Sequence, residues 1–261
     1  MIRIGTCGYS RYQPEGEWKS RYNDKLQAYA DSFDAVELNR TFYKLPMTKT
    51  AGRWRKEVPE EFVFTVKAWQ AITHPTSGVT WRKRKEKLSQ EELDGYGNLN
   101  PTRVVFDAWE QTCSVAREPR APVVLLQTPS SFSPEEQNVE NLREFASKVE
   151  RHGMKIAWEP RGEWNNRLDL VEELCSQLDL IHVADIMRRE PRSAGDTAYI
   201  RLHGLNERET DYDYDYKEEE LQELARQLRK LESRYTRVYC MFNNYEMYSN
   251  ALRLEEILSD R

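Results

Sequence analysis

The sequence predicts an α/β fold in which eight parallel strands and their connecting helices close into a barrel. Short apolar runs recur eight times along the 261 residues, and segments with helical periodicity separate most of them. The length suits a (β/α)8 barrel of the TIM type, which typically takes about 250 residues. The alternative is an open, doubly wound sheet, but the first run is followed by GTCGYS, which lacks the GxGxxG spacing of a dinucleotide-binding fold. We therefore expect a single TIM-like barrel domain over residues 1–261.

The predicted strands share a composition rich in Val, Ile, Leu and aromatic side chains, which is typical of buried strands. In chain order they are Ile2–Gly5, Ala35–Leu38, Phe62–Val66, Val123–Leu126, Lys155–Trp158, Leu180–Val183, Ala198–Leu202 and Val238–Phe242.

The clearest helical pattern runs over Ser133–His152. Ser133 is a favourable N-cap, Pro134 suits the first helical position, and Glu136 completes an S-x-x-E capping box. Gly153 supplies a stop after the last turn. Apolar stripes predict two further helices on either side of the last strand, through Leu221, Leu224, Ala225, Leu228 and Leu231 and through Ala251, Leu252, Ile257 and Leu258.

Residues 70–118 form a long connection between the third and fourth predicted strands. We expect an extended, partly helical excursion there, within the same domain, and interpret it as a lid beside the mouth of the barrel.

Composition and charge exclude several classes of protein. No window approaches the ~18 consecutive apolar residues of a membrane-spanning helix. The first ten residues are too polar for a secretory signal, so we expect a cytoplasmic protein. The net charge of −5 gives no global field that favours nucleic acid. The four cysteines form no CxxC motif and are expected to be free, buried thiols.

Two segments depart from the mixed-charge pattern. Residues 82–87 (RKRKEK) are basic, and residues 207–220 (ERETDYDYDYKEEE) are acidic with alternating Asp and Tyr. Each is interpreted first as a solvated loop or helix start. The alternatives are a phosphate-binding role for the basic run, and a loop that closes over a site for the acidic one.

Alternation along the strands places polar groups at one end of the predicted barrel. Residues two apart share a face of a strand, and the face opposite the purely apolar one ends in a polar group on most strands. The groups are Glu37, Lys67, Gln127, Glu159, Arg201, His203 and Asn243. A single pair, such as Glu37 with Lys67, is explained equally well as a buried ion pair that closes the barrel. The whole ring favours a functional site at the C-terminal mouth, where barrel enzymes hold their active sites. The sixth strand is ambiguous, because His182 and Asp185 lie on opposite faces.

Seven segments spread over nearly the whole chain carry a family resemblance. They are IGTCGYS at 4–10, VELNRTFYKLP at 36–46, FTVKAWQAITHP at 64–75, LLQTPSSF at 125–132, AWEPRGEW at 157–164, YIRLHG at 199–204 and FNNY at 242–245. Together they resemble the YecE-like family, the proteins of domain of unknown function 72. The resemblance implies a TIM-like barrel, related in shape to the barrels of xylose isomerase and endonuclease IV, with a polar pocket built from these motifs. It implies no particular reaction.

The ring offers candidates for catalysis. Glu37 and Glu159 suit a general base and acid if their environments separate their pKa values. Lys67 is an electrophile or charge clamp, and less favourably a Schiff-base nucleophile. Arg201 suits a carboxylate or phosphate, and His203 binds an anion or shuttles a proton. The candidate substrate-binding residues are Asn39, Tyr43, Gln127, Arg161, Asp185, Asn243 and Asn244.

No cofactor is certain from the sequence, and a divalent metal stays open. Glu37, Glu159, Asp185 and His203 are ligand types for Mn, Mg or Zn. Against a metal, the eighth strand ends in Asn rather than a carboxylate, and nearby Arg and Lys side chains neutralise the carboxylates.

Three functions compete. The leading one is an enzyme, a hydrolase or isomerase, that acts by acid–base chemistry on a small anionic or polyhydroxylated molecule. The second is a metal-assisted phosphodiesterase or nuclease-like hydrolase that uses residues 82–87 to hold a nucleic-acid backbone, although nucleic acid is not favoured. The third is a non-catalytic protein that binds a metabolite at the same mouth. None of the three involves a membrane.

Overall fold

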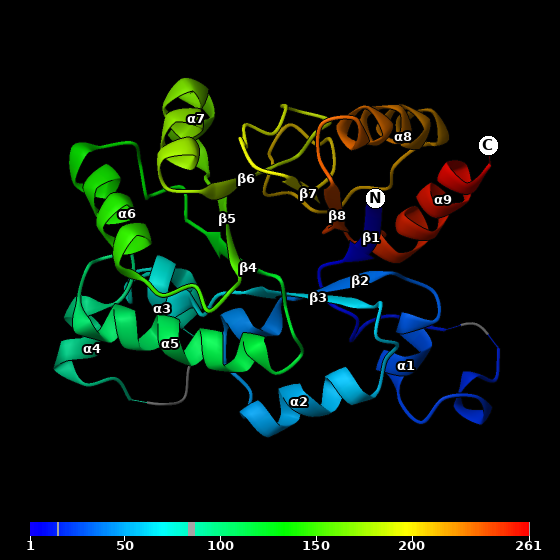
Figure 1. Ribbon diagram of the computed structural model, residues 1–261, viewed down its shortest axis with the longest axis horizontal. Coiled ribbons are helices and arrows are strands. Elements are labelled where there is room, and N and C mark those ends of the chain that lie inside the picture. Colours follow the sequence, from blue (N-terminus) through cyan, green and yellow to red (C-terminus); the bar gives the residue numbers. More distant parts are fainter. Residues whose placement is uncertain (15, 83–86, 261) are drawn as a thin grey trace.

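Eight parallel strands close into a barrel, as the sequence predicts (Figure 1). The structure is a computed structural model that describes residues 1–14, 16–82 and 87–260. Each strand pairs with its neighbours in chain order, and β1 pairs with β8 to complete the barrel. The strands are β1 (Ile2–Thr6), β2 (Ala35–Leu38), β3 (Val63–Lys67), β4 (Val123–Gln127), β5 (Lys155–Glu159), β6 (Leu180–Ala184), β7 (Thr197–Leu202) and β8 (Arg237–Phe242).

Helices surround the strands in Figure 1. The α-helices are α1 (Lys25–Ala30), α2 (Thr48–Lys56), α3 (Gln70–Thr73), α4 (Gln90–Gly95), α5 (Arg103–Arg117), α6 (Glu136–Lys148), α7 (Leu168–Gln177), α8 (Glu218–Glu232) and α9 (Met247–Ser259), and the short 3-10 helices are η1 (Trp18–Ser20), η2 (Arg40–Phe42), η3 (Val79–Trp81) and η4 (Gly162–Asn166). The long connection over residues 70–118 is partly helical, as expected, because it contains α3, η3, α4 and α5. By contrast, residues 185–196 run from β6 to β7 as a loop without a helix.

The predicted capping box of α6 is wrong. The helix begins at Glu136, and its N-cap is Glu135, which makes no side-chain cap. The Ser133 hydroxyl donates instead to Glu135 Oε1 at 2.9 Å, and its carbonyl oxygen accepts from Asn138 Nδ2 at 2.9 Å. These local bonds hold Ser133 outside the helix, since Ser side chains readily form such alternatives to a cap. The stripe predicted for α8 is confirmed, because its five apolar residues are the buried ones.

Two hydrophobic clusters confirm the predicted alternation along the strands. The larger lies between strands and helices and includes Val36, Phe64 and Trp158. The smaller fills the barrel with Cys7, Ala35, Val123, Leu125, Ala157, Ile181, Val183, Tyr199, Tyr239 and Met241. Because Ile181 and Val183 point inward, Asp185 belongs to the inner face. His182 points outward, where its Nδ1 accepts from the Arg192 amide at 3.0 Å.

The strand register pairs polar side chains of neighbouring strands near the C-terminal end of the barrel. Gln127 is opposite Glu159 across β4 and β5, and Glu37 is opposite Thr65 across β2 and β3. The site is built at this end of the barrel.

Two features of the chain bear on its class. All four cysteines are free and buried, as predicted. Among the described residues, no helix has both the length and the apolar character that crossing a bilayer requires.

Candidate functional site

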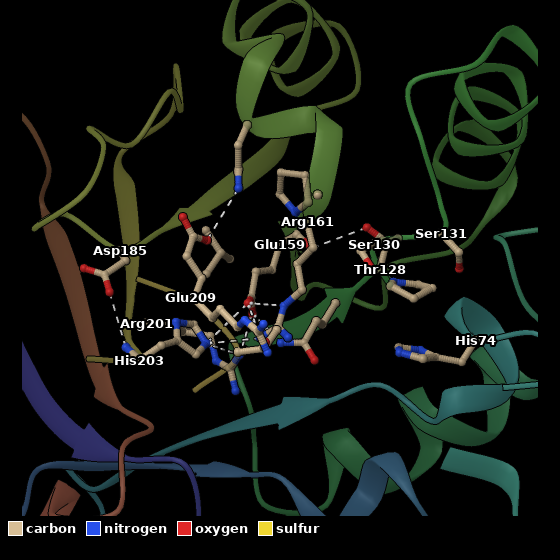
Figure 2. Close-up of a pocket in the computed structure, with 18 of the residues that line it drawn as sticks. His74, Thr128, Ser130, Ser131, Glu159, Arg161, Asp185, Arg201, His203 and Glu209 are labelled. Atoms are coloured by element: carbon tan, nitrogen blue, oxygen red, sulfur yellow. Dashed lines mark hydrogen bonds and ion pairs between the residues drawn. The ribbon is translucent and has the colours of Figure 1, made fainter. Parts of the chain in front are cut away.

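A cavity of about 620 Å³ opens at the C-terminal ends of β4 to β7 (Figure 2). Six of the residues predicted from the sequence line it, namely Gln127, Glu159, Arg161, Asp185, Arg201 and His203. Figure 2 shows Glu159, Arg161, Arg201 and His203 gathered together, with Asp185 and His74 on opposite sides of them.

Arg201, near the end of β7, connects the side chains of Glu37 and Glu159. We call these three residues the floor of the cavity. Arg201 Nε and Nη2 donate to the two carboxylate oxygens of Glu37 at 3.0 and 2.8 Å, and its Nη1 donates to Glu159 Oε2 at 2.5 Å. The residue is fully buried. A buried guanidinium is tolerated only when it is paired, and here two carboxylates, from β2 and β5, pair with one cation.

Glu159 is held as an ionised carboxylate. Besides Arg201, its Oε1 accepts from Arg161 Nε and Nη2 at 3.1 and 3.0 Å, and its Oε2 accepts from Gln127 Nε2 at 2.9 Å. Burial by itself disfavours the charge, but the positive charges of Arg201 and Arg161 outweigh it and hold the pKa of Glu159 well below its usual range. Glu159 therefore has no proton to donate near neutral pH.

Lys67 is the last residue of β3 and is not among the residues that line the cavity. Its Nζ donates to Gln127 Oε1 at 2.8 Å and sits 4.2 Å from the centre of the Phe42 ring. Burial, and then the charge of Arg201, lower the pKa of Lys67 to about 7. The amine therefore loses its proton far more readily than an exposed lysine does.

His203 and Asp185 differ in their capacity to carry a proton. His203 Nε2 faces Arg161 Nη2 at 3.3 Å and Arg201 Nη1 at 3.4 Å, and it must be the acceptor because a guanidinium only donates. Burial lowers the pKa of His203 to about 3, so the ring is neutral. Asp185 accepts from the amides of Met187 and His203 at 3.1 and 3.3 Å, and burial raises its pKa to about 6. Asp185 thus changes charge near neutral pH.

A family model described as "Protein of unknown function DUF72" matches residues 3–261. The chain belongs to the DUF72 family. This confirms the resemblance drawn from the seven motifs, which all lie within that range.

Relatives of this DUF72 protein agree with the match. UPF0759 protein YunF of Bacillus subtilis (strain 168) is 26% identical over 272 residues, which cover 94% of this chain and 89% of YunF. A DUF72 family protein of Thermotoga maritima MSB8 has a TM-score of 0.71 at 26% identity, with 100% of both chains covered. One from Enterococcus faecalis V583 has a TM-score of 0.72 at 20% identity, covering 100% of this chain and 98% of the other. A D-tagatose 3-epimerase-like protein has a TM-score of 0.56 at 17% identity, covering 99% and 96%, and shares the fold alone.

The other predicted site residues of the DUF72 protein do not line this cavity. Glu37 is fully buried beneath Arg201. Asn39 Nδ2 donates to the Cys7 carbonyl at 3.5 Å, while the Tyr43 side chain is 60% exposed. Asn244 Nδ2 donates to the Tyr214 carbonyl at 2.8 Å and to Asn250 Oδ1 at 2.7 Å. Lys67 and Asn243 are the remaining two of these six residues. The predicted roles of all six in binding or catalysis stay predictions.

Several lining residues were not predicted. They are His74, Thr128, Ser130, Ser131, Arg189 and Glu209, all of which lie in loops beyond the strand ends. Three of them belong to the LLQTPSSF motif, which was a usable signal. His74 follows α3 in the long excursion, and its Nδ1 lies 2.9 Å from the Thr73 hydroxyl oxygen. The excursion thus supplies part of the cavity wall.

Part of the acidic segment lines the cavity. Arg208, Glu209 and Thr210 line it, and the Tyr212 hydroxyl accepts from Arg161 Nη1 at 3.1 Å. We call residues 206–216 the lid. The name does not include the excursion over residues 70–118, whose interpretation as a lid stays a prediction. Of the basic run at 82–87, residues 83–86 lie outside the described residues, so its predicted phosphate-binding role stays a prediction.

The carboxylates of the site do not fit a divalent metal. Among the described residues, no three His, Cys, Asp or Glu side chains come together in a way that would hold an ion. Arg161 and Arg201 already bond both oxygens of Glu159, and Asp185 accepts from two backbone amides. Guanidinium groups therefore take the places around Glu159 that a cation would need.

Proposed function

We propose that this DUF72 protein is an enzyme that acts by acid–base chemistry on a small, hydroxylated anion bound in the cavity. One observation carries the proposal: fixed guanidinium groups and a buried carboxyl group that titrates near neutral pH, Asp185, line the same cavity. Its volume, about 620 Å³, suits a small molecule.

Arg161, Arg201 and Glu159 serve as a rigid polar platform. The hydrogen bonds that Arg161 makes to Glu159, His203 and Tyr212 fix the plane of its guanidinium group. A platform oriented in this way binds oxygen atoms of a ligand without first reorganising, which is the main source of electrostatic catalysis in enzymes.

Asp185 is the proton carrier in this proposal. Its ionised form accepts a proton from a C–H or O–H group of the ligand, and its protonated form returns the proton to the same or a neighbouring atom. A group whose pKa lies near the working pH is efficient in both directions. This assignment differs from the pair Glu37 and Glu159, because Glu159 stays ionised and Glu37 is sealed below Arg201. Shuttling a proton between positions of one ligand favours an isomerase over a hydrolase.

The metal-assisted phosphodiesterase alternative has less support, since the described carboxylates are bonded by arginines and amides rather than grouped as metal ligands. A protein that only binds its ligand remains the competing outcome of the test below.

The test is proton exchange in deuterated water. Aldonic acids and sugar phosphates are incubated with the protein, and NMR measures loss of their C–H signals. We expect exchange for one class of ligand, with a rate that rises with pH through about 6 as Asp185 ionises and then levels off. Asp185→Asn should lower the rate at least about a hundred-fold.

Asp169→Asn is the matched control, because Asp169 is exposed on α7 and outside the cavity. It should exchange at the wild-type rate. Equal rates in wild type and Asp185→Asn, or binding without exchange for every ligand, would contradict the proposal.

A further inference from the structure

The lid places a carboxylate of the protein itself inside the cavity. Glu209 Oε1 pairs with Arg189 Nη2, and its Oε2 accepts from Arg189 Nη1 at 3.3 Å. Asn165 Nδ2, from η4, donates to the same Oε2 at 3.4 Å. All three residues line the cavity. The two terminal nitrogens of Arg189 each bond a different oxygen of the Glu209 carboxylate. This is the bidentate arrangement by which arginine recognises carboxylates.

We propose that Arg189 and Asn165 form a carboxylate-binding subsite, in which Glu209 holds the place of the carboxylate of a ligand. The inference rests on the proposed function, because it assumes that the cavity binds a small ligand. It adds the class of that ligand: a hydroxylated acid with a carboxylate at one end.

The position of Arg189 relative to Asp185 supports a role in orienting the ligand. The Arg189 amide donates to the Asp185 carbonyl at 2.9 Å, so both side chains project from one turn of the loop that follows β6. A carboxylate held on Arg189 fixes one end of the ligand at a set distance from the proton carrier. Positioning of this kind is worth large factors in rate, since misplacement of the reacting atoms by about 1 Å is costly.

The lid is anchored at both ends and exposed between them. At the far end, Tyr216 OH accepts from the Gly204 amide at 3.0 Å, and Asn250 Nδ2 donates to Asp215 Oδ1 at 2.7 Å. At the near end, the Asn206 carbonyl accepts from Arg188 Nη2 at 2.5 Å. Between these anchors, Glu209 is flanked by Arg208 and Thr210, which are exposed. The segment around Glu209 can therefore withdraw its side chain while both ends stay in place.

The Arg189–Glu209 pair is suited to exchange because water reaches it. Its side chains are 17% and 36% exposed, and partly exposed ion pairs hold weakly. A tethered carboxylate acts as a competitor at an effective concentration of the order of millimolar. Arg161 also lines the cavity, and its side chain is 19% exposed. A ligand that also bonds Arg161 has a contact that Glu209 lacks, and so displaces it.

The experiment measures binding of D-gluconate by calorimetry, with sorbitol as the neutral probe of the same carbon chain. Glu209→Gln removes the internal competitor and should bind gluconate about ten-fold more tightly than the wild type does. Sorbitol affinity should not change. Arg189→Gln in the Glu209→Gln background should abolish the gain. Glu207→Gln is the matched control, because Glu207 is an exposed carboxylate of the lid that does not line the cavity. It should behave as the wild type does.

Three results would overturn the inference: equal gluconate affinity in wild type and Glu209→Gln, the same gain in Glu207→Gln, or no binding to Glu209→Gln up to about 50 mM. The binding assay requires no turnover, so its failure is separable from that of the proposed function. If gluconate binding depends on Glu209 and Arg189 but no ligand exchanges protons, the proposed enzyme activity is contradicted and the proposed subsite is supported. If protons exchange at the same rate in the Arg189 and Glu209 variants as in the wild type, the enzyme activity is supported and the subsite is contradicted.

Discussion

The floor and the lid of the cavity each contain an arginine paired with glutamate, yet the two pairs are in opposite environments. On the floor, Arg201, Glu37 and Glu159 have side chains that are 1%, 0% and 7% exposed. At the lid, Arg189 and Glu209 are 17% and 36% exposed. The same chemistry therefore serves two purposes. Where water is absent, separating the charges is prohibitive and the pair fixes geometry. Where water enters, the pair can open and its arginine becomes available to a ligand.

The largest effect expected from this comparison is on folding stability at the floor. Arg201→Met leaves the buried carboxylates of Glu37 and Glu159 without their shared cation. Removing one partner of a buried ion pair typically costs about 3–5 kcal/mol. Urea unfolding at pH 7 measures the free energy of unfolding. A loss below about 1 kcal/mol would show that water reaches the floor and would erase the difference between the two pairs.

An intermediate effect of opposite sign is expected at Asp185. Burial raises its pKa to about 6, so between about pH 4 and pH 6 the folded protein keeps a proton that the unfolded chain has lost. Stability therefore falls as pH rises through this window, and above it the ionised carboxylate destabilises the fold by up to about 3 kcal/mol.

Asp185→Asn removes that cost, so it should raise the free energy of unfolding at pH 8 and change it little at pH 4. Urea unfolding at the two pH values checks this. A gain of the same size at both would mean that packing, and not ionisation, is responsible. A variant that is more stable but inactive would mark Asp185 as a group kept for chemistry.

The smallest effect is expected for the lid pair. Arg189→Met should lower the free energy of unfolding by less than about 1 kcal/mol, because the pair is partly exposed. The same urea titration as for Arg201→Met gives a direct comparison. Losses of equal size in the two variants would break the contrast and identify the lid as part of the folded core.

Site residues on a strand, or within two residues of its end, were predictable by alternation, while residues farther into the loops were not. Alternation along a strand is a local property, so Glu159, Arg201 and His203 could be assigned to the mouth without a structure. The rule fails where the backbone leaves the extended conformation. Asn39 has φ −81° and ψ −23° and leads into η2, so it and Tyr43 leave the alternation.

The lining residues Arg189 and Glu209 lie in loops that carry no periodic signal, and their meeting depends on how two distant loops fold. The capping box of α6 failed for a related reason. Ser133 has a competing partner in Glu135, and the sequence alone does not rank the two. The barrel itself was predictable, because eight apolar runs of similar length, most of them separated by helical patterns, indicate eight parallel strands.

The loop from β6 to β7 has an evolutionary consequence. Elsewhere in the barrel, a change in a connection must preserve the apolar stripe of a helix that packs on the strands. Residues 185–196 contain no such helix. Ile186 is the loop's buried member of the hydrophobic core, and polar contacts hold other parts of the loop, such as that of Ser193 Oγ with the His182 amide at 2.8 Å. This loop carries both Asp185 and Arg189. Proteins with the same barrel can therefore acquire new ligand preferences there by single substitutions, insertions or deletions, without rebuilding the core.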